Sequence, residues 1–247
     1  MKNYSLDELW TTEGRRGAPF SPEDVAGLPE PARRYLTHAI APGTPRASAV
    51  RLRMHGEIKL GTWSPFIAEE VIRWDRGFIW KATVRMKGLP VLGSDRWIDG
   101  EGSMRWKLLG LIPVMTGSGP DISRSALGRV QAEAVWLPSV LLTPGVTWHT
   151  PDATHTEATL SLRGQEARVT LGTDETGLLK TVSLQRWGNP DKGDARLHPF
   201  GGLVEDEATF EGYTLPSKLR LGWYFGTERF EPEGEFFRVT LDHATFR

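Results

Sequence analysis

Most of the chain alternates apolar and polar residues with the period of two that is typical of β-strands. The alternation begins near residue 46, where Val50, Leu52 and Met54 are separated by charged residues. One face of such a segment is buried and the other is exposed. Similar segments recur at short spacing as far as residue 246. The pattern predicts roughly eleven strands, at a spacing that suits an antiparallel sandwich or barrel.

Two stretches interrupt the predicted strands. Residues 87–95 contain Lys87-Gly88-Leu89-Pro90 and Leu92-Gly93-Ser94-Asp95, which are typical of loops. Leu111–Gly119 is apolar but does not alternate. We therefore predict loops in the first stretch and an irregular apolar segment in the second.

The period changes to that of a helix between Asp121 and Leu142. Residues at three- and four-residue spacing lie on one helix face. Here the apolar ones are Ile122, Ala126, Val130, Leu137 and Val140. Pro138 removes a helical hydrogen bond and clashes with the preceding turn. The regular helix should therefore stop or kink near Leu137, which places it at about residues 121–138.

The N-terminal part of the chain predicts short helices only. Residues 1–20 are polar and are expected to be loosely ordered. Ser21-Pro22-Glu23-Asp24 has the composition of a helix start. A second short helix is predicted over residues 32–39, so residues 21–40 form a helical lead-in to the strands.

These elements predict one domain over residues 1–247, with a mainly β fold. A sheet of this size must curl, because strand twist accumulates across it. The helix at 121–138 is the best candidate to fill the concave side. We therefore expect a large curled antiparallel sheet over residues 46–246, forming an open barrel wrapped around a central α-helix, with short helices before it.

Composition excludes several classes of function. The formal net charge is -1, which argues against a nucleic-acid partner. There is no cysteine, so disulfides and thiolate chemistry are excluded. No segment is apolar for long enough to span a bilayer, and the N-terminal sequence has no signal-peptide pattern. We predict a cytoplasmic protein, whose oligomeric state the sequence leaves open.

No known catalytic or metal-binding motif occurs in the chain. The six histidines form no HExxH motif and no close pair, so zinc is not indicated. The serine motifs GxSxG and SxxK are absent. Asp95, Asp99 and Glu101 form an acidic cluster whose spacing fits a hairpin turn better than a calcium loop. Catalytic residues stay unknown, whether the protein is an enzyme is undecided, and no metal or cofactor is predicted.

Glu133 is the most unusual residue of the predicted helix, because it falls on the apolar face. Arg129 lies four residues earlier, so the two side chains can meet across one turn. A buried carboxylate beside an arginine stays charged. Three interpretations remain open: an internal ion pair that fixes the helix, a polar anchor or general base on the floor of a pocket, or a helix face that leaves Glu133 in solvent.

Ten tryptophans are spread along the chain. Tryptophan suits places where an apolar wall meets a polar group, so these residues either fill the core or line a cavity. The preferred hypothesis is a carrier or sensor of a small apolar or amphipathic molecule. Trp80, Trp106 and Trp136 would line its cavity, and Arg129 and Glu133 would recognise a polar head. The alternatives are an enzyme that uses Glu133 as acid or base, and an interaction domain with a filled core.

Five stretches carry a resemblance to known proteins. They are residues 28–36 (LPEPARRYL), 93–104 (including GSD and GEGSM), 108–114 (LLGLIPV), 132–138 (AEAVWLP) and 222–227 (GWYFGT). In this order they resemble a bacterial family of uncharacterised proteins, known as a domain of unknown function. The resemblance implies no activity, cofactor or catalytic residue. The predicted open barrel also looks like the lipoprotein-carrier fold, in which a half-barrel sheet holds a lipid chain against helices, but this architectural likeness does not carry function.

Overall fold

A computed structural model describes residues 4–11 and 17–247, and in these residues thirteen strands form one antiparallel sheet. The spatial order is β6-β5-β4-β3-β2-β1-β13-β12-β11-β10-β9-β8-β7. In chain order the strands are β1 (Ala49–Leu60), β2 (Thr62–Arg73), β3 (Gly77–Met86), β4 (Leu89–Ile98), β5 (Glu101–Leu108), β6 (Ile112–Ser118), β7 (Thr147–His149), β8 (His155–Leu162), β9 (Gln165–Thr173), β10 (Leu179–Gly188), β11 (Arg196–Phe210), β12 (Tyr213–Trp223) and β13 (Glu235–Phe246).

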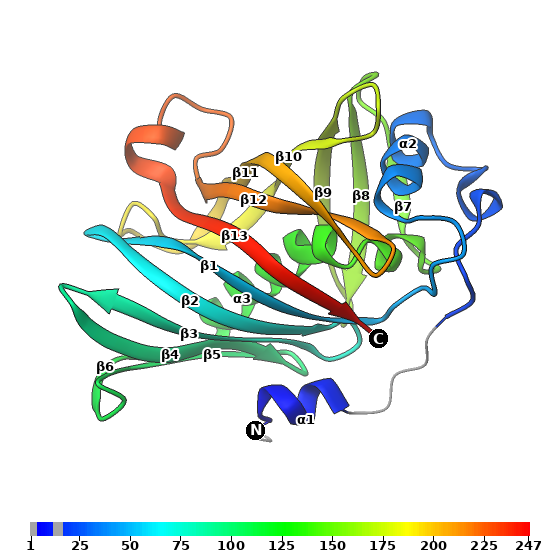
Figure 1. Ribbon diagram of the computed structural model, residues 1–247. Helices are drawn as coiled ribbons and strands as arrows, with labels where there is room; N and C mark the ends of the chain where they lie inside the picture. Colours follow the sequence, from blue (N-terminus) through cyan, green and yellow to red (C-terminus); the bar gives the residue numbers. More distant parts are fainter. Residues whose placement is uncertain (1–3, 12–16) are drawn as a thin grey trace.

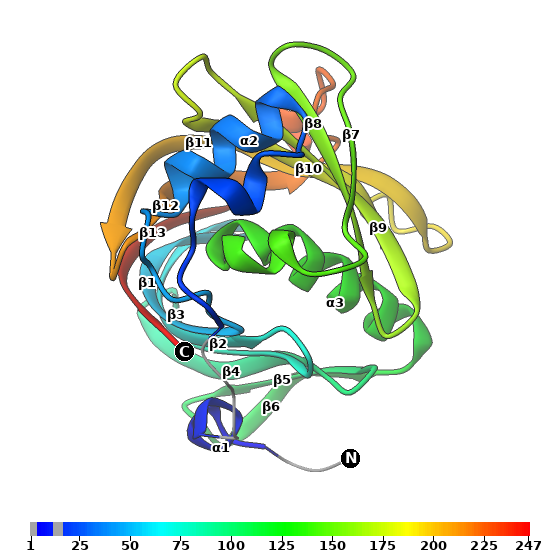
Figure 2. The ribbon, with the colours of Figure 1, turned by 90° about the vertical axis from the view of Figure 1, so that its right-hand side faces the viewer.

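The sheet is built from two runs of sequential antiparallel strands. β1 and β13 join the two runs, and Val50 pairs with Phe246 across this junction. β6 and β7 therefore form the two edges. Alternation along the strands turns Val50, Leu52 and Met54 inward, and all three are buried. The sheet curls around the helix that follows β6, as Figures 1 and 2 show.

That helix, α3 (Pro120–Ala132), lies on the concave side and contacts strands from both halves of the sheet. It continues as two 3-10 turns, Glu133–Trp136 and Pro138–Leu142. The core lies between these segments and the sheet, and Leu137 and Leu141 are almost fully buried within it. The predicted mainly β fold, with one curled antiparallel sheet around a helix, is confirmed.

The helix ends earlier than position 138, where we predicted it to end. The regular helix stops at Ala132, and Leu137 adopts an extended φ of -139°. The residue before a proline is disfavoured in helical conformation, which explains Leu137. The preceding turn, from Glu133, tightens to 3-10 geometry.

Two segments that we predicted to be loops or irregular are strands. β4 covers most of residues 87–95, with Gly93 paired to Ala82 and to Trp106. β6 occupies most of Leu111–Gly119 at the edge of the sheet, with a register shift against β5 between Trp106 and Lys107. These two strands bring the roughly eleven that we predicted to thirteen.

The N-terminal helices cover different parts of the sheet. Leu9 of α1 (Leu6–Thr11) packs against Val71, Ile79 and Ile98 in a small cluster separate from the main core. Residues 4–11 are therefore not loosely ordered as predicted, and the rest of that prediction falls in part on residues 1–3 and 12–16, outside the described residues. The 3-10 turn Pro22–Val25 and α2 (Glu30–Ala39) form the expected helical lead-in.

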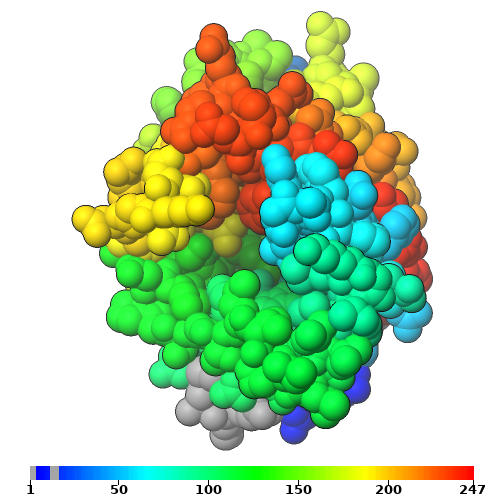
Figure 3. Space-filling view, turned by 90° about the vertical axis from the view of Figure 1, so that its left-hand side faces the viewer, coloured from blue at the N-terminus to red at the C-terminus, as the bar shows by residue number. Residues whose placement is uncertain are grey.

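The two ends of the curled sheet differ: α2 covers one end, and the other end is open (Figures 2 and 3). Figure 2 shows α2 lying across one end. The face seen in Figure 3 is hollowed in its centre, between segments coloured cyan, green, yellow and orange-red. A π-helical turn, Phe230–Gly234, lies in the orange-red segment. Among the described helices, none has the length and apolar character needed to cross a bilayer.

Candidate functional site: a cavity beside the central helix

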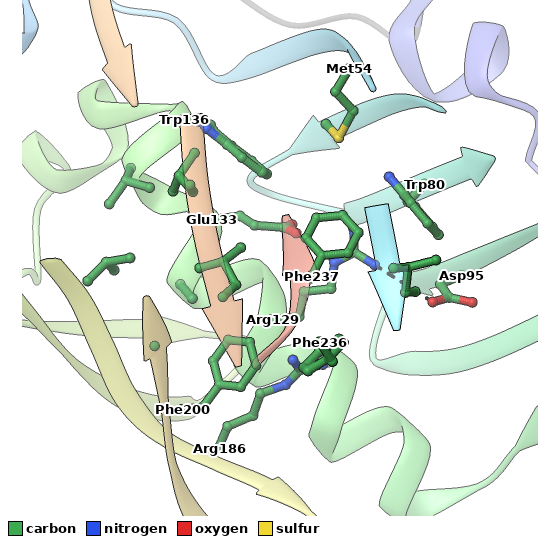
Figure 4. A pocket seen from close by; sticks show the side chains of 17 residues that line it. Met54, Trp80, Asp95, Arg129, Glu133, Trp136, Arg186, Phe200, Phe236 and Phe237 are labelled. Carbon is green, nitrogen blue, oxygen red and sulfur yellow. Dashed lines mark hydrogen bonds and ion pairs between the residues drawn. The ribbon is translucent and has the colours of Figure 1, made fainter. Parts of the chain in front are cut away.

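A cavity lies between the concave face of the sheet and the C-terminal end of α3. Its volume is about 140 Å³, and apolar atoms dominate its wall. The aromatic part of the wall, shown in Figure 4, consists of Trp80, Trp136, Phe200, Phe236 and Phe237. An engineered apolar cavity of about 150 Å³ holds benzene. The cavity is therefore large enough for a small apolar group.

The aromatic wall is held in place by ring contacts. The ring centroids of Phe66 and Phe237 lie 5.0 Å apart in a stacked arrangement. Trp80 contacts Phe237 at 6.0 Å and Trp106 at 5.7 Å. Such contacts contribute about 0.5–1.5 kcal/mol each beyond the area they bury. The wall near Trp80 is therefore a preformed surface.

Arg129 is the centre of a charged cluster beside the cavity, here called the Arg129 cluster, which also contains Glu70, Asp95 and Glu133. The Nε of Arg129 donates to Glu133 Oε1 at 2.6 Å, and Nη2 donates to Glu70 Oε1 at 2.9 Å. Its Nη1 lies 3.8 Å from Asp95 Oδ2. Glu70 is fully buried. One guanidinium therefore interacts with three carboxyl groups, which come from β2, β4 and the 3-10 turn after α3.

Secondary structure explains how these carboxylates meet. Glu133 follows Arg129 by one helical turn, and its backbone N–H caps the end of α3. Glu70 of β2 lies an even number of residues from Phe66 and Ile72, so it shares their face of the strand, and both are buried in the core. Asp95 of β4 is held by Trp106, whose Nε1 donates to its Oδ1 at 2.9 Å.

Burial raises the pKa values of the three carboxyl groups of the cluster. Burial raises the pKa of Glu70 well above its ordinary value, and the nearby charge of Glu133 raises it further. Burial also raises the pKa values of Asp95 and Glu133, against the opposing effect of Arg129. Burial disfavours the charge of Arg129, but the three carboxylates together raise its pKa above its ordinary value. Glu70 is the most buried of the three carboxyl side chains.

The substitution Glu70→Gln tests the raised pKa of Glu70. Because the folded protein holds the Glu70 proton more tightly than the unfolded chain, wild-type stability falls as pH rises from the ordinary pKa of 4.5 through the raised folded value. Glutamine does not ionise. The unfolding free energy of Glu70→Gln relative to wild type should therefore increase across this window, measured by urea denaturation between about pH 4 and pH 8. The matched control is Glu69→Gln on the same strand. A Glu70→Gln difference that does not change with pH would refute the assignment.

Two polar atoms of cavity-lining side chains have no protein partner. Trp80 Nε1 and Glu133 Oε2 are both buried, and no described residue hydrogen-bonds to either. Glu70 Oε2, deeper in the cluster, is also without a described partner. Buried polar atoms normally have partners, and leaving one unpaired costs about 1–3 kcal/mol. The cavity wall thus offers an unpaired donor and an unpaired acceptor.

A second arginine, Arg186 of β10, also lines the cavity. Its Nε donates to the carbonyl oxygen of Ser125 at 3.0 Å, and its guanidinium lies 4.5 Å from the Phe200 ring centroid. Gly128 of α3 makes room for it, since a Cβ there would lie 3.0 Å from Arg186 Cγ. Burial and the charge of Arg129 lower the pKa of Arg186 to about 10, so it remains charged at neutral pH.

The structure brings together most of the residues selected from sequence. Arg129, Glu133, Trp80 and Trp136 all line the cavity, and the indole of Trp136 donates to the carbonyl oxygen of Pro216 at 3.0 Å. Trp106 is not among the lining residues; it lies behind Trp80. Glu133 is buried, so the interpretation that left it in solvent is wrong.

Sequence reasoning missed three charged residues of the site. Glu70 could have been found from its parity with Phe66 and Ile72 on β2. Asp95 was assigned to a loop and an acidic turn, which concealed its inward position on β4. Arg186 has the parity of Val182, which is buried, but one arginine in a strand is a weak signal.

Among the described residues, no group of three His, Asp or Glu side chains could hold a metal ion.

The comparison with protein families identifies the family of this chain. The model of a family of unknown function, DUF6544, matches residues 18–233. The chain belongs to this family. Membership in DUF6544 confirms the predicted resemblance to a family of uncharacterised proteins and brings no activity with it. No curated protein is detectably similar in sequence to this DUF6544 member.

Two solved structures resemble the fold of this DUF6544 chain at a distance. One is a LolA superfamily protein from Nitrosomonas europaea, with 8% identity, a TM-score of 0.43, and 88% of this chain and 92% of that chain covered. The other is a putative outer membrane lipoprotein-sorting protein domain from Vibrio parahaemolyticus, with 10% identity, a TM-score of 0.36, and coverage of 81% and 86%.

Proposed function

We propose that the protein binds a small apolar or amphipathic molecule in the cavity between α3 and the concave face of the sheet. The observation that carries this proposal is an apolar, aromatic wall with two buried polar atoms, Trp80 Nε1 and Glu133 Oε2. Neither atom has a hydrogen-bond partner among the described residues. Ligand pockets are typically apolar, with a few polar groups that orient the ligand. Trp80 and Trp136 form part of the wall, and Trp106 supports it from behind.

The polar end of the cavity indicates how such a ligand would be oriented. Arg129 is engaged by three carboxylates, so its role is to hold Glu133 and Asp95 in position. Glu133 keeps one oxygen available, which accepts a hydrogen bond from a hydroxyl or amide of the ligand. The Trp80 indole N–H donates to an oxygen. A polar atom of the ligand beside these side chains would pair with them, and its apolar part would lie along Phe237 and the other aromatic rings of the wall.

The two alternative hypotheses have less support. An enzyme that uses Glu133 as acid or base needs a second titratable group to exchange protons with it, and Arg129 is the one described side chain that hydrogen-bonds to its carboxylate. An interaction domain would have a filled core, whereas a cavity remains between the C-terminal end of α3 and the sheet. A cytoplasmic location stays a prediction, which cell fractionation tests.

Filling the cavity tests the proposal. Leu221 of β12 is partly buried and lines the cavity, so Leu221→Trp places an indole in the ligand space. The control is Leu203→Trp on β11, at a partly buried leucine that is not among the lining residues. We expect saturable binding of 1-octanol to wild type and to Leu203→Trp by isothermal titration calorimetry. Leu221→Trp should bind at least about tenfold more weakly, a loss of about 1.4 kcal/mol.

The result depends on both variants being folded. Circular dichroism and the melting temperature establish this before titration. Native mass spectrometry of protein purified from cells should show a bound small molecule in wild type that is depleted in Leu221→Trp. Equal binding of 1-octanol by Leu221→Trp and wild type, or no binding by wild type, would rule out this cavity as the site.

A further inference from the structure

Arg186 lies where the cavity meets a second, more polar recess. This recess has a volume of about 370 Å³ and extends toward Trp187, Asn189 and Pro190. Arg186, Arg129 and Asp95 line both spaces. A ligand whose apolar part occupies the cavity would therefore carry its head group past Arg186.

Arg186 has unused hydrogen-bonding capacity, in contrast to Arg129. Its Nε is satisfied by Ser125, but no described residue accepts a hydrogen bond from its Nη groups. No described carboxylate lies within 4.0 Å of it, whereas Arg129 has three acidic partners at that distance. The guanidinium instead lies beside the rings of Phe200 and Trp223, at 4.5 and 5.3 Å from their centroids.

The carboxylates that face Arg186 are already engaged. Asp95 accepts from Trp106 and lies beside Arg129, and Glu133 accepts from Arg129. A partly desolvated cation beside aromatic rings, with free Nη donors, is most favourably satisfied by an anion. The fork of donors in a guanidinium matches the two oxygens of a carboxylate.

We propose that the cavity takes an anionic amphiphile, a monocarboxylic acid with a small apolar body, whose carboxylate binds the Nη groups of Arg186. This inference rests on the proposed function, because it assumes that the apolar body occupies the cavity. The body packs against Phe200 and Phe237, and the carboxylate lies at the boundary with the polar recess. Arg186 is thus the residue that selects acids over neutral molecules of the same length.

Matched pairs of ligands test the selection. Octanoate and 1-octanol have the same chain length and differ in the charged head group. Wild type is expected to bind octanoate about 10- to 100-fold more tightly than 1-octanol, which is the usual contribution of hydrogen bonds to a charged group. Arg186→Gln should remove this preference, because it weakens the binding of octanoate far more than that of 1-octanol. Arg186→Lys, which keeps the charge but loses the fork, should retain part of it.

Arg124→Gln is the matched control. Arg124 is an exposed arginine of α3, and its guanidinium also packs on an aromatic ring, 3.6 Å from the Trp187 centroid. It does not line the cavity. It should keep the full preference for octanoate. Equal affinity of wild type for both ligands, or an unchanged preference in Arg186→Gln, would overturn the assignment of Arg186 while leaving cavity binding intact. Failure of both ligands to bind would instead remove the proposed function. If inorganic phosphate displaced octanoate at a concentration comparable to that of octanoate, the site would bind a free anion. That result would overturn the proposal of an amphiphilic ligand.

Discussion

Replacing Arg129 with methionine is expected to lower the free energy of unfolding by about 3–5 kcal/mol. Methionine fills a similar volume, so packing is largely retained. The loss comes from Glu70, Asp95 and Glu133, which would be left beside the cavity without their shared cation. Urea denaturation at neutral pH measures the change. An isolated domain has about 5–15 kcal/mol of stability in total, so this one substitution should bring the fold close to its limit.

Two further variants identify the cause of this loss. Arg124→Met removes an exposed arginine from the same helix and should cost no more than about 1 kcal/mol, the usual value of an exposed cation–π contact. Adding Glu70→Gln to Arg129→Met removes one of the unpaired acidic groups and should restore part of the stability. If Arg129→Met were as stable as Arg124→Met, the cluster would not hold α3 in the sheet.

The substitution Gly93→Ala should also destabilise the fold strongly, by about 1–3 kcal/mol, because it overpacks a close contact. A Cβ at Gly93 would lie 2.2 Å from Trp106 Cδ2 and 2.6 Å from the carbonyl oxygen of Arg105. Trp106 would be pushed away from Asp95 and from the ring of Trp80. Denaturation measures the loss, and near-ultraviolet circular dichroism should report the displaced tryptophans.

Gly27→Ala is the control for this change. A Cβ at Gly27 has no atom within 4 Å, and its backbone is not in the left-handed region. Its stability should therefore stay within about 0.5 kcal/mol of wild type. Equal stability of Gly93→Ala and Gly27→Ala would mean that Trp106 is not supported by β4 in the way the geometry indicates.

The periodicity of the chain predicts most of this fold, because every second residue of a strand is apolar and faces the core. Val50, Leu52 and Met54 illustrate this, and the switch to helical spacing after Asp121 identifies the element inside the curl. Local sequence is misleading where its composition favours one structure and the tertiary packing imposes another. Gly93 lies in a sequence typical of a loop, yet β4 pairs there with β3 and β5. The position is a glycine because the Trp106 ring occupies the space that a Cβ would need.

The site is less predictable than the fold, because its charged residues come from different elements. Arg129 and Glu133 are visible in the sequence as a pair on one helix. Glu70 and Arg186 become significant only when the curled sheet brings β2 and β10 against α3. No local pattern specifies that Arg129 is engaged by three carboxylates while no carboxylate of the described residues lies within 4.0 Å of Arg186.

A crystal structure of the protein grown with octanoate tests the central claim most directly. The account predicts an alkyl chain between Trp136, Phe200 and Phe237, with its carboxylate within hydrogen-bonding distance of the Arg186 Nη groups. A structure in which these aromatic side chains close the space beside α3, with octanoate bound elsewhere or absent, would contradict it.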